Sequence, residues 1–160
     1  MMRGYYNKPE ANADSFRGEW FRTGDLARRD DRGFYYIVGR TKDMIRRSGE
    51  NIAAREVEVV VLMLPEVVDA AVVPVPDQDR GEEVKLYLAL QPGLTAKDLP
   101  VERIQAHCRA NLASYKVPRY YHFIPEMPRT ASNKIEKGTL KTLSPDLRTG
   151  AYDVVEGVWR

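Results

Sequence analysis

The sequence is poor in cysteine and has no long apolar run. Cys108 is the only cysteine among 160 residues, so the chain forms no internal disulfide and no cysteine-rich zinc site. No stretch approaches the roughly 18 apolar residues that a membrane-spanning helix needs, and no signal-peptide core opens the chain. Lysine and arginine outnumber the acids by only 25 to 23, which argues against binding to polyanions. We therefore expect a soluble, cytoplasmic protein that has no metal site, no membrane span and no nucleic-acid partner.

The composition is that of a globular protein, with 43% hydrophobic and 30% charged residues. A chain of 160 residues holds either one ordinary core or a domain of about 100 residues with appendages. Residues 1–14 contain tyrosines and a proline with no preceding element against which they could pack. We therefore favour the second interpretation and expect the start to be truncated.

Residues 19–40 predict a β-hairpin, because the turn-forming cluster 30–33 separates two strand-like segments. Folding the chain about this cluster places Asp25 roughly opposite Val38, and Arg40 on the order of 7 Å further along the strand. A carboxylate accepts hydrogen bonds from vicinal hydroxyls and a guanidinium donates to oxygen. Asp25 and Arg40 could therefore hold a ribose diol, although a turn aspartate and a solvated arginine explain the same residues.

A connector with a glycine near each end follows, over residues 39–52. Residues 40–43 are polar, Met44 and Ile45 form an apolar pair, and residues 48–51 form a second turn before a helix. Such a connector can absorb large changes in backbone dihedral angles, and its glycines let a ligand approach the main chain. A tight hairpin between two strands is the alternative.

The rest of the chain alternates helix and strand patterns. The predicted elements are a helix over 53–64, strands over 67–75 and 84–90, a helix from an N-cap at Asp98 to Leu112, and a strand over 120–124. Cys108 falls on the apolar face of the second helix as a core residue, and we assign His107 beside it no catalytic role. Residues 144–160 show no period. The order βαββαβ predicts an α+β fold in which helices pack on a small sheet.

A polar loop over residues 130–133 carries Lys134 ahead of a short helix that contains Lys137. A lysine on such a loop can be aimed at a ligand. Lysines spaced three and four residues apart, here Lys134, Lys137 and Lys141, are also typical of a solvent-facing helix. Both interpretations stay open on the spacing alone.

Four segments resemble successive signatures of the adenylate-forming superfamily, which contains acyl-CoA synthetases, nonribosomal peptide adenylation domains and firefly luciferase. They are GEWFRTGDLARRDDRGFYYIVGR, TKDMIRRSGENIAAREVE, YKVPR and PRTASNKIEK. Within the superfamily, GENI and SNKIEK are most similar to acyl- and aryl-CoA ligases, including the crotonobetaine/carnitine type. The resemblance implies that residues 1–40 are the last strands of an N-terminal AMP-binding domain, 41–141 a mobile C-terminal lid domain, and 142–160 a tail.

The resemblance also implies a reaction. A carboxylic acid and ATP, with Mg²⁺ in the intact enzyme, form an acyl-adenylate; the lid then rotates and coenzyme A attacks the carbonyl. Matched position by position, the implied roles are ribose binding by Asp25 and Arg40, the hinge at Lys42, the approach to coenzyme A at Ser48, Gly49 and Glu50, and a bridge between carboxylate and α-phosphate by Lys134.

Two positions depart from the pattern, because Asn133 and Ser48 stand where many relatives have glycine. The chain also lacks the phosphate-binding loop and the acid pocket of the family. We therefore expect no adenylation by this chain alone, and the acid stays unassigned. The alternative is a non-catalytic module that docks on a separate AMP-binding domain, and a carrier-protein thiol could replace coenzyme A.

Overall fold

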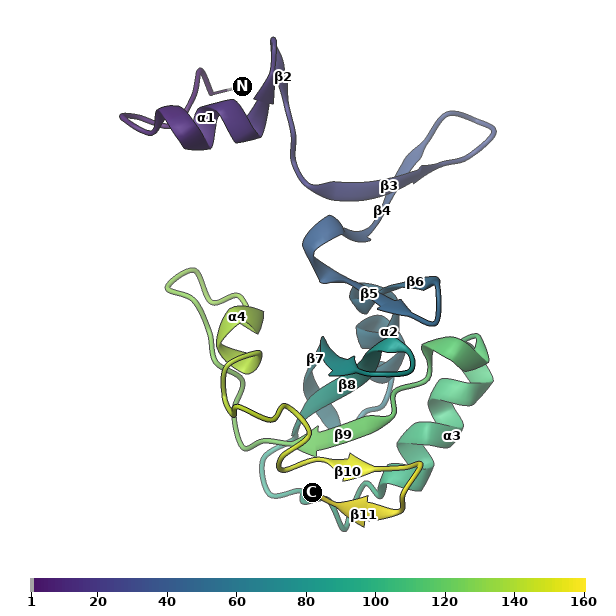
Figure 1. Cartoon of the computed structure of the whole chain (residues 1–160). Helices are drawn as coiled ribbons and strands as arrows, with labels where there is room; N and C mark the ends of the chain where they lie inside the picture. Colours follow the sequence, from purple (N-terminus) through teal and green to yellow (C-terminus); the bar gives the residue numbers. More distant parts are fainter. Residues whose placement is uncertain (1) are drawn as a thin grey trace. The chain divides into compact units, whose positions relative to one another are not determined.

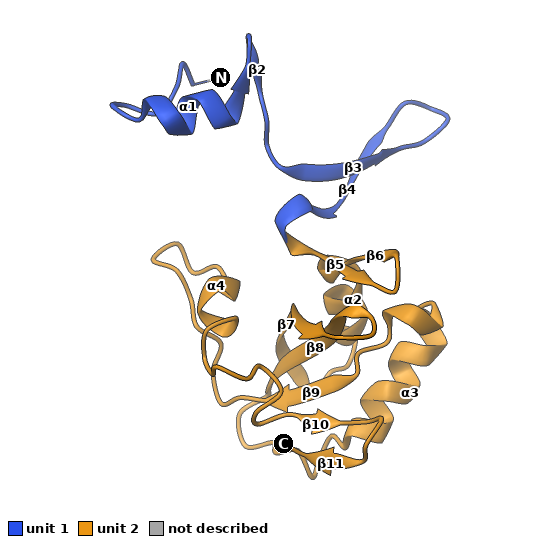
Figure 2. Ribbon diagram, viewed as in Figure 1, with its two compact units in different colours: residues 1–42 blue, residues 43–160 orange. Residues whose placement is uncertain are grey.

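The structure, a computed structural model, describes residues 2–160 (Figure 1). The chain forms two compact units, residues 1–42 and residues 43–160 (Figure 2). None of the helices described over residues 2–160 is both long and apolar enough to cross a membrane. The elements of the first unit are α1 (Pro9–Ser15), β1 (Phe16–Arg17), β2 (Trp20–Phe21), β3 (Asp25–Arg29), β4 (Tyr35–Arg40) and the start of the 3-10 helix η1 (Thr41–Asp43).

The predicted hairpin is confirmed as the antiparallel pair β3–β4, but its predicted register is wrong by two residues. Asp25 lies opposite Arg40 and not opposite Val38. One residue of this difference in register comes from the turn, which pairs Arg29 with Tyr35 and so does not fold about the middle of the cluster. The second comes from a bulge, because the register shifts between Leu26 and the next residue of β3. The bulge brings the two side chains directly across from each other.

The second unit is built around one mixed sheet. Its elements are β5 (Met44–Arg47), β6 (Glu50–Ala53), α2 (Ala54–Val61), β7 (Val67–Asp77), β8 (Gly81–Leu90), α3 (Val101–Asn111), η2 (Ser114–Lys116), β9 (Tyr120–Phe123), α4 (Lys137–Leu140), β10 (Tyr152–Asp153) and β11 (Val158–Trp159). The strand order is β11-β10-β9-β8-β5-β6, with β7 paired to β8. β8 is antiparallel to β7 and parallel to β9. The predicted α+β class with helices on a small sheet is confirmed.

The central strand β8 is buried on both faces. Val84, Leu86 and Leu88 pack in one cluster with residues of α2 and α3, whereas Tyr87 and Ala89 pack in a second cluster with Leu140 of α4. Because side chains alternate along a strand, the two clusters lie on opposite faces of the sheet. The sheet therefore fixes α4 and the loop before it on the face away from α2 and α3.

Helix α3 begins later than predicted. Its N-cap is Pro100, not Asp98. The Asp98 carboxylate instead accepts hydrogen bonds from the backbone N–H and the hydroxyl of Thr95, both at 2.8 Å, so it closes a local turn before the helix. Cys108 is fully buried, as predicted for a core residue, and this burial raises the pKa of its thiol to about 11.

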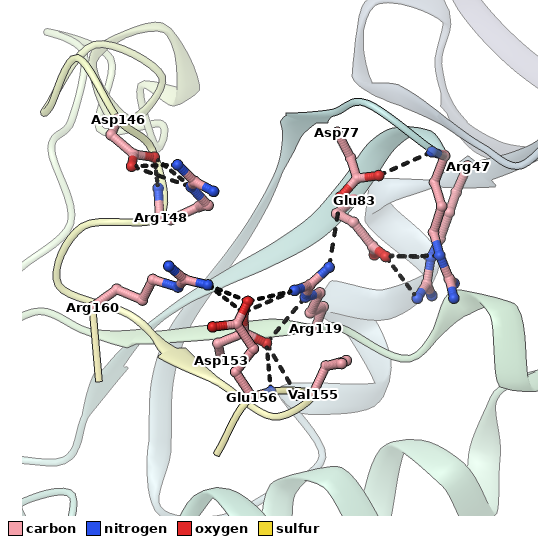
Figure 3. A network of polar contacts seen from close by, with 11 residues as sticks. Arg47, Asp77, Glu83, Arg119, Asp146, Arg148, Asp153, Val155, Glu156 and Arg160 are labelled. Carbon is pink, nitrogen blue, oxygen red and sulfur yellow. Dashed lines mark hydrogen bonds and ion pairs between the residues drawn. The ribbon is translucent and has the colours of Figure 1, made fainter. Parts of the chain in front are cut away.

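Residues 144–160 contain two short strands, β10 and β11, although their sequence shows no period. β10 pairs with β9, and β11 pairs with β10. Asp153, which is fully buried, holds this extension in place: Arg119 donates to both of its carboxylate oxygens at 3.0 Å (Figure 3). Strands of two residues are too short to show a period, so only the buried ion pair marks them.

His122 in β9 should make the free energy of unfolding of the chain depend on pH. Its ring stacks on Tyr87 with centroids 4.9 Å apart, and burial, together with the nearby Lys85 charge, lowers the pKa of His122 from 6.5 to about 4. Between these values the unfolded chain binds more protons than the folded chain, so the free energy of unfolding should fall as the pH falls through this window.

Urea unfolding of the chain between pH 7 and pH 4 measures this dependence. We expect His122→Phe to flatten the slope, because phenylalanine keeps the stacking and removes the titrating group. His107→Gln is the matched control and should retain the slope. An unchanged slope in His122→Phe would contradict the assignment.

Candidate functional site

Asp25 and Arg40 form a cross-strand ion pair in the first unit. Arg40 Nε donates to Asp25 Oδ1 at 3.0 Å, and the two side chains are 65% and 27% exposed respectively. Within residues 2–160, Asp25 Oδ2 and the two Nη nitrogens of Arg40 make no other polar contact. An acceptor and two donors thus lie side by side at the surface, which is the arrangement that a vicinal diol can bridge.

Lys42, the predicted hinge residue, lies in η1 at the boundary between the two units. Its side chain is exposed. The next residue, Asp43, is the first residue of the second unit and leads directly into β5.

The turn between β5 and β6 is tighter than predicted. Ser48 and Gly49 form a two-residue hairpin loop between the paired residues Arg47 and Glu50, so the tight-hairpin alternative describes this part of the connector. Both loop residues have positive φ, 51° for Ser48 and 84° for Gly49, as a type I′ turn requires. A Cβ built on Gly49 would meet no atom within 4 Å. The backbone of Gly49 is therefore open to a ligand.

The positive φ of Gly49 predicts that a larger residue there would destabilise the chain through backbone strain and not through a steric clash. Gly49→Ala should lower the free energy of unfolding by about 1–2 kcal/mol, because an L-residue is strained in the left-handed region. Gly138→Ala in α4 is the matched control, since Gly138 also has open space around it and is helical; it should stabilise by about 0.5–1 kcal/mol. Thermal unfolding of both variants checks the pair, and losses of equal size would contradict the backbone explanation.

Lys134 lies on an ordered loop, as the aimed-lysine interpretation requires. Thr130 N–H donates to the Lys134 carbonyl at 2.8 Å, and Lys134 N–H donates to the Thr130 hydroxyl at 3.2 Å. Asn133 has φ of 61°, so it occupies the left-handed conformation that its glycine counterpart would adopt more freely. Arg129 secures the loop from outside by donating to the Asn133 carbonyl at 3.0 Å and to Asp69 of β7 at 2.5 Å. The exposed Lys134 side chain thus extends from a fixed backbone.

The Lys134 loop and the Gly49 turn lie at opposite ends of the β7–β8 hairpin. The loop is tied to Asp69, near the start of β7. The turn is tied to the other end, because Ser48 N–H donates to the carbonyl of Arg80 at 2.9 Å, beyond the end of β7 at Asp77. The rise per residue in a strand puts these anchors on the order of 25 Å apart. Figure 1 shows the β5–β6 turn and the loop before α4 on separate sides of the second unit.

Lys137 makes ion pairs within the second unit that its spacing in the sequence did not reveal. Its ammonium lies 2.6 Å from Glu58 Oε1 and 3.8 Å from Asp43 Oδ2, and its side chain is only 19% exposed. The solvent-facing interpretation is therefore wrong for Lys137. The signal in the sequence was Glu58 itself, a carboxylate between Val57 and Val60 on the buried side of α2.

The residues present do not suggest a metal site. Over residues 2–160, no group of three or more histidine, cysteine, aspartate or glutamate side chains is arranged to hold an ion.

Comparison with known proteins identifies a domain and a set of relatives. Residues 56–134 match the family described as AMP-binding enzyme C-terminal domain. The sulfoacetate–CoA ligase of Cupriavidus necator is 40% identical over 138 residues, covering 86% of this chain and 26% of the ligase. The 2-succinylbenzoate–CoA ligase of Bacillus licheniformis is 42% identical over 142 residues, covering 88% of this chain and 28% of the ligase.

Solved structures agree with these matches. The o-succinylbenzoate CoA synthetase of Bacillus subtilis, in complex with its acyl-adenylate intermediate, aligns with a TM-score of 0.77 at 38% identity, covering 88% of this chain and 28% of that one. The anthranilate CoA ligase AuaEII, in complex with anthranoyl-AMP, aligns with a TM-score of 0.81 at 34% identity, covering 88% of this chain and 27% of that one. The chain thus spans between a quarter and a third of the length of these proteins.

Proposed function

We propose that this chain forms the mobile lid of an ATP-dependent acid–thiol ligase. The premise is that it belongs to the adenylate-forming, AMP-binding enzymes and carries their C-terminal domain. The observation that carries the proposal is the placement of Lys134 and Gly49 at opposite ends of one hairpin of that domain. Two distant groups on one rigid body suit two successive steps, each served by a different side of the lid.

The first step is the attack of a carboxylate on the α-phosphate of ATP, which releases pyrophosphate. Both reactants are anionic, so an ammonium between them offsets their repulsion and stabilises the charge that develops in the transition state. Lys134 supplies this ammonium from a loop whose backbone is fixed by Thr130 and Arg129. Asp25 and Arg40 bind the ribose hydroxyls, for which their outward-facing acceptor and donors are suited.

The second step is the attack of a thiol on the acyl-adenylate, which forms the thioester and releases AMP. The lid turns about Lys42, withdraws Lys134, and brings the Ser48, Gly49 and Glu50 turn to the pantetheine arm of coenzyme A. The open space above Gly49 supports this role, because the arm can lie against the backbone there. The named relatives act on sulfoacetate and 2-succinylbenzoate with coenzyme A, so we propose a carboxylic acid and coenzyme A as substrates, in the cytoplasm.

A graft tests the proposal with a known acid. The 142 matched residues of the B. licheniformis 2-succinylbenzoate–CoA ligase are replaced by the whole 160-residue chain, and thioester formation from 2-succinylbenzoate, ATP and coenzyme A is followed. We expect the graft to form thioester, and the isolated chain and the truncated ligase to form none. A folded graft that binds ATP without turnover would overturn the proposal in favour of a docking module.

A further inference from the structure

Lys137 joins the segment that carries Lys134 to the residue that follows the hinge. We propose that Lys137 is a positioning residue. Through its ion pairs with Glu58 and Asp43, it couples the backbone conformation of η1 to the placement of the Lys134 ammonium. This inference rests on the proposed function, because it assigns Lys137 a part in the adenylation step only.

The Glu58 side of the link is buried and firm. Glu58 Oε1 accepts the Lys137 ammonium at 2.6 Å and the backbone N–H of Val72 at 2.8 Å, and its side chain is only 7% exposed. Val72 lies in β7, which pairs with β8 alone among the described strands, so the carboxylate also covers the free edge of β7. Glu58 thereby fixes the Lys137 ammonium against the sheet.

The Asp43 side of the link is looser and lies at the hinge. Its Oδ2 is 3.8 Å from the same ammonium, and its side chain is 31% exposed. Asp43 is the last residue of η1, which also contains Lys42. A hinge motion that changes the backbone of η1 as far as Asp43 therefore moves the Asp43 carboxylate relative to Lys137. One ammonium is therefore shared between a fixed carboxylate and one that moves with the hinge.

The ammonium in turn controls the Lys134 loop through a short, packed connection. Lys137 is the first residue of α4 and comes three residues after Lys134. Ile135 between them, and Leu140 beyond, pack in the cluster that covers one face of β8. Because only Ile135 and Glu136 separate the two lysines, a displacement of the Lys137 backbone also displaces the loop that carries Lys134.

Asp43→Asn tests the coupling with the least disturbance of the fold, because it leaves the Glu58 pair intact. Lys137→Arg keeps the charge and is expected to retain activity. Lys137→Gln would strand the Glu58 carboxylate and is unsuitable, since a variant that unfolds reports nothing on positioning. Glu102→Gln is the matched control, an exposed carboxylate of α3 in the same unit.

In the grafted ligase, we expect Asp43→Asn to slow adenylation about tenfold, which corresponds to roughly 1.4 kcal/mol of transition-state stabilisation. Thioester formation from preformed acyl-adenylate should change less than about twofold, and Glu102→Gln should change neither step. Equal slowing of both steps by Asp43→Asn would indicate a merely structural residue and would overturn the inference. A normal Asp43→Asn beside an inactive Lys134→Ala would do the same while leaving the proposed function standing. Full activity of Lys134→Ala would refute the proposed function instead.

The isolated 160-residue chain offers a second readout that needs no activity. Asp43→Asn should shift the amide resonances of residues 130–135 in a ¹H–¹⁵N correlation spectrum, whereas Glu102→Gln should leave them in place. Unshifted loop resonances in Asp43→Asn would show that the hinge and the loop are not coupled.

Discussion

Replacing Lys134 by alanine in the grafted ligase should slow adenylation by two to three orders of magnitude. Loss of one preorganised donor at a developing charge typically costs about 3–4 kcal/mol of transition-state stabilisation. The loop should keep its shape, because its hydrogen bonds run through the Lys134 backbone and not through its side chain. The measurement is acid-dependent exchange of labelled pyrophosphate into ATP.

Thioester formation from preformed acyl-adenylate should be unaffected in Lys134→Ala, since the proposed ammonium acts in the first step alone. Lys141→Ala is the control, a lysine just beyond the same short helix for which residues 2–160 provide no ion pair. It should retain both steps. An undiminished exchange rate in Lys134→Ala would remove Lys134 from the mechanism.

Replacing Asp153 by alanine should destabilise the chain by about 3 kcal/mol, because breaking a buried ion pair leaves the partner charge without compensation. The carboxylate is fully buried and accepts from Arg119, Arg160 and the Val155 N–H (Figure 3). We expect β10 and β11 to detach from β9, which also releases the loop whose Leu147 carbonyl accepts the buried Lys85 ammonium at 2.5 Å. Urea unfolding gives the loss, and a lower m-value would report the detached segment.

The same segment provides the control. Asp146 pairs with Arg148 at 2.9 Å, but their side chains are 49% and 45% exposed. Such an exposed pair contributes only about 0–1 kcal/mol, so Asp146→Ala should be nearly silent. Similar losses in the two variants would mean that burial does not set the strength of these pairs, contrary to our explanation.

Much of the second unit could be predicted from local patterns. The helix predicted over residues 53–64 is found as α2, although it ends at Val61. Leu64, just beyond it, is buried, and so are the apolar residues at helical spacing within it, Val57, Val60 and Val61. The buried strand β7 and the buried position of Cys108 were also predicted correctly. In each case the spacing of the apolar residues follows from the geometry of a single helix or strand, so a short stretch of sequence is enough to predict which residues are buried.

What could not be predicted depends on local irregularities and on pairings between distant residues. The register of Asp25 with Arg40 follows from the exact turn residues and from a bulge, and no local pattern marks either. The Asp98 carboxylate is used by Thr95, so the helix begins elsewhere. Asp153 finds its partner Arg119 across 34 positions of the sequence. Ion pairs of this kind are chosen by the fold and leave no period in the sequence.

The candidate site divides in the same way. The turn at Gly49 and the loop of Lys134 were placed by their turn-forming residues, and the structure adds the left-handed conformations of Ser48 and Asn133. Their positions at opposite ends of β7–β8 could not be derived, since the anchors Asp69 and Arg80 are remote in sequence. The roles of these residues in catalysis stay predictions.

The central claim is that one lid serves two steps with two different sides. The most direct test measures both half-reactions of the grafted ligase in Lys134→Ala and in Gly49→Leu. The leucine strains the backbone but meets no atom of the chain, and it would block a pantetheine arm. The account predicts that Lys134→Ala loses pyrophosphate exchange alone and Gly49→Leu loses thioester formation alone. Loss of the same half-reaction in both variants would show that a single pose serves both steps, and would contradict the account.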